Sequence, residues 1–141
     1  MTTRRVVLQT IGMTGAAGCL GGCGGGGGSG VPRGTATMCG ANLCLDLAEN
    51  TELQLDNGIL FFDQAPGKKL FVRRSGDTFV ALSAVCTHAN CLIDWNGEDQ
   101  FDCDCHGSVF NNMGGVVRGP AAVALRSFAT SVAGDMVTIT L

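Results

Sequence analysis

The chain has 141 residues, a formal net charge of −3 and only 15% charged residues, which is one domain's worth of sequence without a strongly basic composition. We therefore expect no nucleic-acid partner, and no stretch reaches the ~18 uninterrupted apolar residues that a membrane-spanning helix needs. Eight cysteines in so short a chain indicate disulfides, a metal site or both.

Residues 1–22 resemble a bacterial export signal. Arg4 and Arg5 form a twin-arginine pair that precedes a weakly apolar stretch and small residues. The sequence Leu20-Gly21-Gly22-Cys23 resembles a lipobox, which predicts cleavage before Cys23 and acylation of that cysteine; the alternative is an uncleaved N-terminal anchor. The Gly-rich residues 23–37 predict a flexible tether. We expect a protein tethered in the periplasm or on the outer face of a bacterial membrane.

Residues 38–141 are expected to form one folded domain of short strands. Apolar runs at 70–72 and 78–82 flank the turn 75–77, and the segments 125–132 and 136–141 flank a second turn. The pattern predicts an all-β fold, either an antiparallel β-sandwich or a partly open barrel. The expected core consists of Phe61, Leu70, Val72, Phe79, Ala81, Leu125, Phe128, Val137 and Ile139.

Near the start of this domain, Cys39 and Cys44 lie five positions apart. In an exported protein such a pair predicts a local disulfide. Since no spare histidine exists to complete a second metal site, we assign the pair no catalytic role.

Two compact groups of cysteine and histidine lie within the domain. The first is Cys86-Thr-His88-Ala-Asn-Cys91, the second is Cys103-Asp-Cys105-His106-Gly-Ser108, and 14 residues lie between His88 and Cys103. Two cysteines and two histidines at this spacing suit a tetrahedral metal. A plain zinc-binding structural module, however, leaves one further cysteine in each group unexplained.

The two groups resemble the cluster-binding boxes of the Rieske iron–sulfur proteins, and the resemblance covers roughly residues 58–141. It implies one 2Fe-2S cluster, with Cys86 and Cys103 as thiolates on one iron and His88 and His106 as imidazoles on the other. It also implies a Rieske-type sandwich with a small cluster-binding subdomain, whose loops occupy about residues 84–120. Such clusters have potentials of about −150 to +300 mV.

The resemblance extends to positions around the ligands. It implies a disulfide between Cys91 and Cys105, and a hydrogen bond from the Ser108 hydroxyl to a bridging sulfide. Phe110 stands where high-potential members carry tyrosine. Gly119-Pro120 resembles the loop that covers the cluster, here with alanine in place of its second proline.

The implied function is electron transfer, foremost as the iron–sulfur subunit of a quinol-oxidising cytochrome bc-type complex. Its partners would be quinol, a cytochrome b-type subunit and a cytochrome c-type acceptor. The alternatives are the electron-relay small subunit of an exported oxidoreductase similar to arsenite oxidase, bound to a large subunit, and a free-standing tethered Rieske ferredoxin. A zinc-binding structural module is a remote alternative. We find no hydrolytic triad, phosphate loop or acid pair, so we predict no catalytic residues and a subunit rather than an enzyme acting alone.

Overall fold

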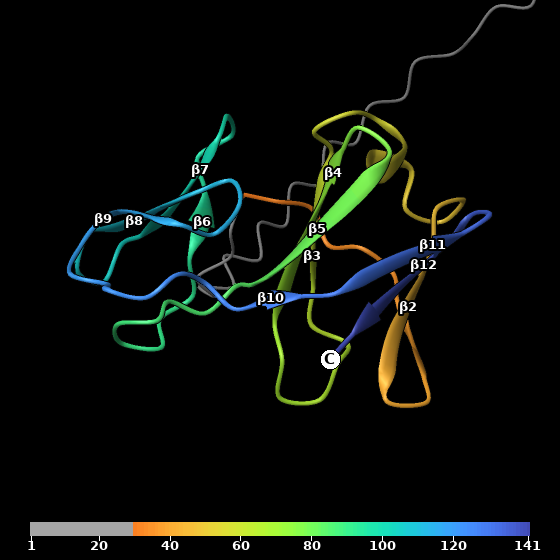
Figure 1. Ribbon diagram of the computed structural model, residues 1–141, viewed down its shortest axis with the longest axis horizontal. Helices are drawn as coiled ribbons and strands as arrows, with labels where there is room; N and C mark the ends of the chain where they lie inside the picture. The colour runs from red at the N-terminus through yellow and green to blue at the C-terminus, as the bar shows by residue number, and fades with distance from the viewer. Residues whose placement is uncertain (1–29) are drawn as a thin grey trace, which may run out of the picture.

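The computed structural model describes residues 30–141, which form strands β1 to β12 and one short 3-10 helix, η1 (Thr51–Gln54) (Figure 1). The strands build three antiparallel four-stranded sheets, so the prediction of an all-β antiparallel fold is confirmed. The predicted signal of residues 1–22 and the predicted acylation of Cys23 lie outside the described residues. Within the described part, no helix has the length and apolar character to cross a membrane.

The first sheet joins the two ends of the described chain. Its strands, in spatial order, are β1 (Thr37–Cys39), β2 (Asn42–Asp46), β12 (Met136–Thr140) and β11 (Thr130–Ala133). Alternate residues of its central strands point inward, and Leu43, Leu45, Val137 and Ile139 are each 0% exposed. The hairpin of β11 and β12 was predicted, whereas β1 and β2 were missed because they are short and are interrupted by a Cys-Gly turn.

The second sheet packs on the first and is buried on both faces. Its strands, in spatial order, are β10 (Ser127–Phe128), β5 (Thr78–Ser83), β4 (Leu70–Ser75) and β3 (Ile59–Phe62). Leu70 and Val72 enter the core shared with the first sheet, while Phe71 between them enters a second core on the opposite face. Burial on both faces explains why β3 and β4 have unbroken apolar runs.

The segment 125–132, predicted as one strand, divides between two sheets. Phe128 of β10 pairs with Ala81 in the second sheet, and Thr130 of β11 pairs with Ile139 in the first. One strand can serve both sheets of a sandwich in this way when it bends between them.

The third sheet lies to one side of the sandwich (Figure 1). Its strands, in spatial order, are β6 (Asp94–Trp95), β7 (Gln100–Cys103), β8 (Ser108–Asn111) and β9 (Val116–Arg118). It is attached through the second core, where the rings of Phe71 and Phe101 lie 5.1 Å apart. All nine predicted core residues are buried, but Phe61 and Leu125 belong to this second core, so the molecule has two cores where one was expected.

Residues 31–37 pack against the sandwich, which corrects the prediction that the tether continues to residue 37. Val31 is only 7% exposed. The Phe61 N–H donates to the Pro32 carbonyl at 2.9 Å, and the Gly34 N–H donates to the Phe61 carbonyl at 2.9 Å. Gly34 is required here because a Cβ atom would collide with the ring of Phe62. The remaining tether prediction rests mainly on residues 23–29, which lie outside the described residues.

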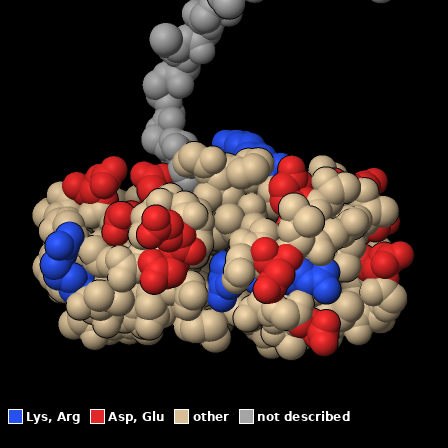
Figure 2. All heavy atoms as spheres, turned by 90° about the horizontal axis from the view of Figure 1, so that it is seen from above, with Lys and Arg blue, Asp and Glu red and all other residues tan. Residues whose placement is uncertain are grey.

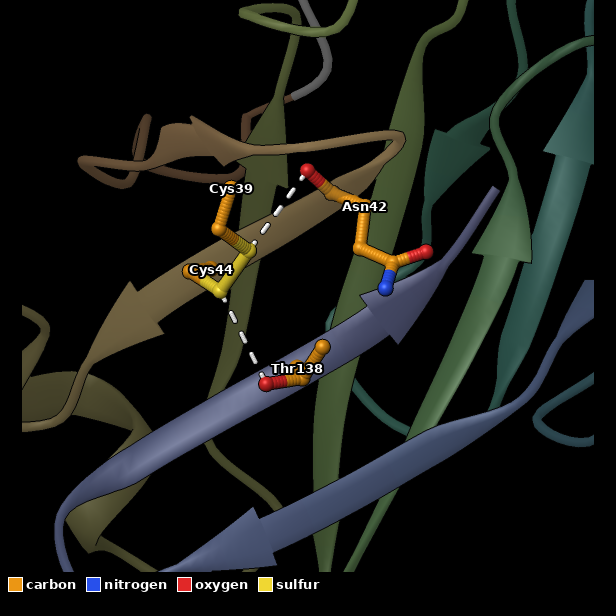
Figure 3. The surroundings of a disulfide bond; sticks show 4 residues. All are labelled: Cys39, Asn42, Cys44 and Thr138. Carbon is orange, nitrogen blue, oxygen red and sulfur yellow. Dashed lines mark hydrogen bonds between the residues drawn. A yellow bond between two sulfur atoms is a disulfide. The ribbon is translucent and has the colours of Figure 1, made fainter.

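A disulfide joins Cys39 and Cys44 in the hairpin of β1 and β2, with their Cα atoms 5.9 Å apart (Figure 3). The Thr138 hydroxyl of β12 lies 3.6 Å from the Cys44 sulfur and is the donor, because a disulfide sulfur carries no proton. The bridge therefore lies on the outer face of the first sheet, behind the inward-facing Leu43 and Leu45.

Candidate metal centre

The first group of site residues lies in the loop between β5 and β6. The Cys86 N–H donates to the Cys91 carbonyl at 2.7 Å, and the Asn90 N–H donates back to the Cys86 carbonyl at 3.1 Å. A bridge between Val85 and Leu92 closes the loop at its base. These bonds make residues 86–91 a compact turn, so the side chains of Cys86 and His88 project from a fixed frame.

The second group lies in the turn between β7 and β8. The Gly107 N–H donates to the Cys103 carbonyl at 2.9 Å, which closes the turn. Gly107 has a φ of +81°, and nothing lies within 4 Å of the position of a Cβ atom. Backbone conformation rather than space therefore calls for glycine directly after His106.

A disulfide between Cys91 and Cys105 connects the two loops, with Cα atoms 6.5 Å apart. The structure therefore contains the cross-link that the resemblance implied. Because the bridge joins the end of one loop to the middle of the other, it fixes the distance between the two groups of candidate ligands.

The four candidate ligands divide into a buried pair and an exposed pair. Cys86 and Cys103 are free thiols that are each 1% exposed. His88 and His106 are exposed, and their rings lie 4.8 Å apart at an angle of 82°. The structure thus brings all four together, with the sulfur atoms on the inside and the imidazoles at the surface.

The two thiols have different electrostatic surroundings. Burial raises the pKa of Cys86, but hydrogen bonds from the backbone N–H groups of His88 and Ala89 and from Cys103 and Ser108 more than offset it, so the net direction is downward. Burial raises the pKa of Cys103, and the adjacent Cys86 sulfur raises it further. The backbone donors around Cys86 would equally stabilise the negative charge of a metal-bound thiolate.

A third loop, residues 119–126, contacts both of the other two, and each contact is a hydrogen bond that involves a side chain. The Ala121 N–H donates to the Ser108 hydroxyl oxygen at 3.0 Å, and the Thr87 hydroxyl donates to the Val123 carbonyl at 2.6 Å. Ser108 is 0% exposed, and its hydroxyl is one of the hydrogen-bond donors that lower the pKa of Cys86. Sequence reasoning missed Thr87; its position between two candidate ligands was the available signal.

The donor set fits a 2Fe-2S cluster bound through two thiolates and two imidazoles. The sulfur atoms of Cys91, Cys103 and Cys105 lie within 4.8 Å of one another. Those of Cys91 and Cys105 form the disulfide, so they offer no thiolate. The free thiols of Cys86 and Cys103 face the same interior position, and soft thiolates together with imidazoles are ligands that iron–sulfur chemistry uses.

Comparison with known proteins agrees with this geometry. The family model of the Rieske [2Fe-2S] domain matches residues 45–129, which is more than half of the chain. The chain is 48% identical over 60 residues to the cytochrome b6-f complex iron-sulfur subunit of Cyanothece sp. (strain PCC 7425); the match covers 42% of this chain and 34% of that protein. The chain thus spans about a third of the length of the curated relatives it matches.

Two solved structures are similar in fold. The cyanobacterial plasma membrane Rieske protein PetC3 from Synechocystis PCC 6803 has 31% sequence identity and a TM-score of 0.53, covering 60% of this chain and 87% of that one. A chain of a hyperthermophilic respiratory Complex III has 25% identity and a TM-score of 0.54, covering 67% of this chain and 71% of that one.

Proposed function

The chain belongs to the Rieske [2Fe-2S] domain family, and from this premise we propose that it is the electron-transferring iron–sulfur subunit of a quinol-oxidising cytochrome bc-type complex. The observation that carries the proposal is the arrangement of the site, in which buried Cys86 and Cys103 lie behind exposed His88 and His106. The names of the relatives, a cytochrome b6-f subunit and a Complex III chain, support the choice of complex.

The cluster, when bound, supplies a one-electron couple at a potential above that of an all-thiolate cluster. Cys86 and Cys103 would hold it from the interior, where their burial excludes water from the sulfur atoms. His88 and His106 would hold it from the surface, where the second ring nitrogen of each imidazole stays accessible. Such a nitrogen can accept the proton of a quinol hydroxyl, so the site can take a proton and an electron together.

The purified protein should contain two irons and two sulfides per chain, with a Rieske-type electron paramagnetic resonance spectrum after reduction. Deleting the gene should abolish quinol-dependent reduction of cytochrome c by membranes, and the protein should co-purify with a cytochrome b-type subunit. A folded, colourless protein that contains zinc and no iron would refute the electron-transfer function.

A second candidate is a free-standing tethered Rieske carrier. The similarity to the Rieske protein PetC3, which covers 87% of that chain, favours this candidate. Phe110 in place of tyrosine also favours it. The two candidates differ in co-purification: a carrier would leave the membrane without a cytochrome b-type subunit, and membranes lacking it would keep their quinol-dependent activity.

We propose further that the protein is exported by the twin-arginine route and held at the membrane through Cys23. The Arg4-Arg5 pair and the lipobox-like residues 20–23 support this proposal. Cys23→Ala should leave an unprocessed precursor, and labelled palmitate should appear only on the wild type. A mature protein without lipid that begins at another residue would contradict it.

A further inference from the structure

The basic side chains of the described residues are few, and most are already engaged. Arg33 pairs with Asp63 at 2.7 Å. Arg74 donates to the Leu53 carbonyl, and Arg118 donates through Nε to the Gly107 carbonyl at 3.1 Å.

Arg73 is 5% exposed, and one of its terminal nitrogens donates to Asn57 at 3.0 Å. Lys68, Lys69 and Arg126 are the remaining basic side chains of residues 30–141, and none has an ion-pair partner within this part of the chain. We call these three residues the basic patch.

The fold brings the basic patch together from two separate segments. Both segments bond to the end of β5. The Ser83 N–H donates to the Arg126 carbonyl at 2.8 Å, and the N–H of the next residue, Ala84, donates to the Lys69 carbonyl at 2.8 Å. The Arg126 guanidinium lies 5.0 Å from the centre of the Phe128 ring, which restrains it by a cation–π contact.

Two grooves connect the basic patch to the candidate metal centre. The first, of about 240 Å³, is lined by all three members of the patch. The second, of about 260 Å³, contains Lys68 and Lys69 together with Asn90 and Leu92, the two neighbours of Cys91 in the first loop of the site. Asp63, which is paired with Arg33, is the acidic residue lining this groove. A molecule that fills the grooves therefore lies against the loop of Cys86 and His88.

The described domain as a whole carries more acidic than basic residues. All 12 acidic residues of the chain lie within residues 30–141, against seven basic ones. Figure 2 shows many acidic and a few basic side chains on the upper face, and the loop of Lys68 and Lys69 lies at the lower end of the second sheet in Figure 1. The basic patch is thus a local group of positive charges on a domain whose charge is negative overall.

We propose that the basic patch is a docking surface for an acidic electron-transfer protein, which it orients over the first loop of the metal centre. The proposal rests on the electron-transfer function proposed above. Carboxylates of the partner would enter the grooves and pair with Lys68, Lys69 and Arg126, and long-range attraction would raise the rate of association.

The structure favours a protein partner over an anionic membrane. Basic residues near an anionic bilayer contribute only about 1 kcal/mol each, and the excess of acidic residues elsewhere on the domain opposes that contact. The basic side chains also line recessed grooves, which suit projecting carboxylate side chains better than a flat lipid surface.

The test compares two variants of the cluster-loaded protein that change the net charge equally. The patch variant is Lys68→Gln, Lys69→Gln, Arg126→Gln. The control variant is Ala41→Glu, Ser131→Asp, Ala133→Glu, whose exposed positions lie in the first sheet and its β1–β2 turn, at the opposite end of the molecule from the metal centre in Figure 1.

Stopped-flow oxidation of the reduced proteins by an acidic and by a basic c-type cytochrome supplies the readout. The patch variant should react on the order of tenfold more slowly with the acidic cytochrome at low ionic strength. The difference should vanish at about 0.5 M salt, where charges are screened beyond a few ångströms. The control variant should stay within about twofold of the wild type.

Three outcomes would overturn the proposal. Equal slowing of both variants would mean that net charge matters and the patch does not. Loss of binding to phosphatidylglycerol vesicles in the patch variant, with unchanged cytochrome rates, would assign the patch to a membrane. A wild type that shows a Rieske spectrum but is oxidised by neither cytochrome would refute the electron-transfer function, and this docking surface with it.

Discussion

The two ends of the molecule are held together by different means. The sandwich of the first and second sheets surrounds an apolar core in which Leu43, Leu45, Val137 and Ile139 are each 0% exposed. The metal-centre end has strands of only two to four residues, three long or tight loops, and a core that includes the candidate ligands Cys86 and Cys103 themselves.

The two disulfides make the difference concrete. The bridge of Cys39 and Cys44 spans five positions within a hairpin that backbone hydrogen bonds already hold. The bridge of Cys91 and Cys105 spans 14 positions and joins the loop between β5 and β6 to the turn between β7 and β8. The comparison teaches that apolar packing shapes one end, while cross-links and bound cofactor shape the other. The following predictions test this division.

The largest effect is expected from removing a candidate ligand. His106→Ala should abolish the Rieske spectrum completely, because the other histidine, His88, is itself a candidate ligand and cannot replace it. The far-ultraviolet circular dichroism of the sandwich should persist. Iron analysis and electron paramagnetic resonance measure the loss. The control is Cys39→Ser with Cys44→Ser, which should keep the full spectrum; loss of the spectrum in the control would break the division between the two ends.

A cavity in the core of the sandwich should lower stability and leave the cluster spectrum unchanged. Leu43→Ala should lower the free energy of unfolding by about 2–5 kcal/mol, because the side chain is fully buried. Urea unfolding measures the change, and the spectrum of the cluster should keep its shape. Met38, the partner of Leu43 in the neighbouring strand, is 43% exposed, so Met38→Ala should change stability by no more than about 0.5 kcal/mol. Equal costs would place the core elsewhere.

Removal of each disulfide compares the two ends directly. Replacing Cys91 and Cys105 by serine should cost about 3 kcal/mol, and replacing Cys39 and Cys44 should cost about 2 kcal/mol, because the first bridge closes the longer loop. Only the first change should also shift the reduction potential, since the two loops that hold the cluster would lose their fixed separation. Denaturation and voltammetry on the two double variants are the measurements; a reversed order of costs would contradict the loop-length argument.

A smaller, local effect is expected from the hydrogen bonds of the site. Ser108→Ala removes a donor to the Cys86 sulfur, and a hydrogen bond to a charged acceptor contributes about 1.5–3 kcal/mol. Applied to the reduced state alone, this corresponds to a fall of roughly 65–130 mV for one electron. Phe110→Tyr should raise the potential by a similar amount if its hydroxyl reaches a ligand sulfur. Protein-film voltammetry measures the potential of each variant. A potential that stays unchanged in both variants would refute these roles.

The smallest effect concerns a pair of like charges in the third sheet. Asp94 lies opposite Asp102, and burial first, then Asp104 and Asp102, raises the pKa of Asp94. The folded state therefore holds this proton more tightly than the unfolded state, so stability falls as the pH rises from about 4 through the raised pKa. Asp94→Asn should lack this fall.

The Asn variant should be more stable than the wild type at neutral pH by about 0.2–1 kcal/mol, the range for one cross-strand pair. The difference should shrink toward zero below about pH 4. Urea unfolding at several pH values measures it, with Asp77→Asn in the exposed β4–β5 turn as the control. A constant difference at all pH values would exclude titration as its cause.

Much of the sandwich could be predicted because alternation of apolar residues is a local property. The hairpins around Gly76 and Gly134 follow from apolar runs that flank a glycine turn, and the structure has both. The place of β2 in the first sheet could not be predicted, since its pairing with β12 joins segments almost a hundred residues apart. Local sequence carries no signal for such a contact.

The sequence by itself determined which residues can form the site, because ligand chemistry depends on residue type and on spacing along the chain. Both can be read directly for Cys86, His88, Cys103 and His106. Only the tertiary structure decided which of them are enclosed and which face outward, and that the Ser108 hydroxyl also accepts the N–H of Ala121 from a third loop. The physical reason is that burial and hydrogen bonding depend on segments distant in sequence. The same holds for the basic patch. Lys69 and Arg126 lie close together only because their carbonyls accept hydrogen bonds from two adjacent residues at the end of β5.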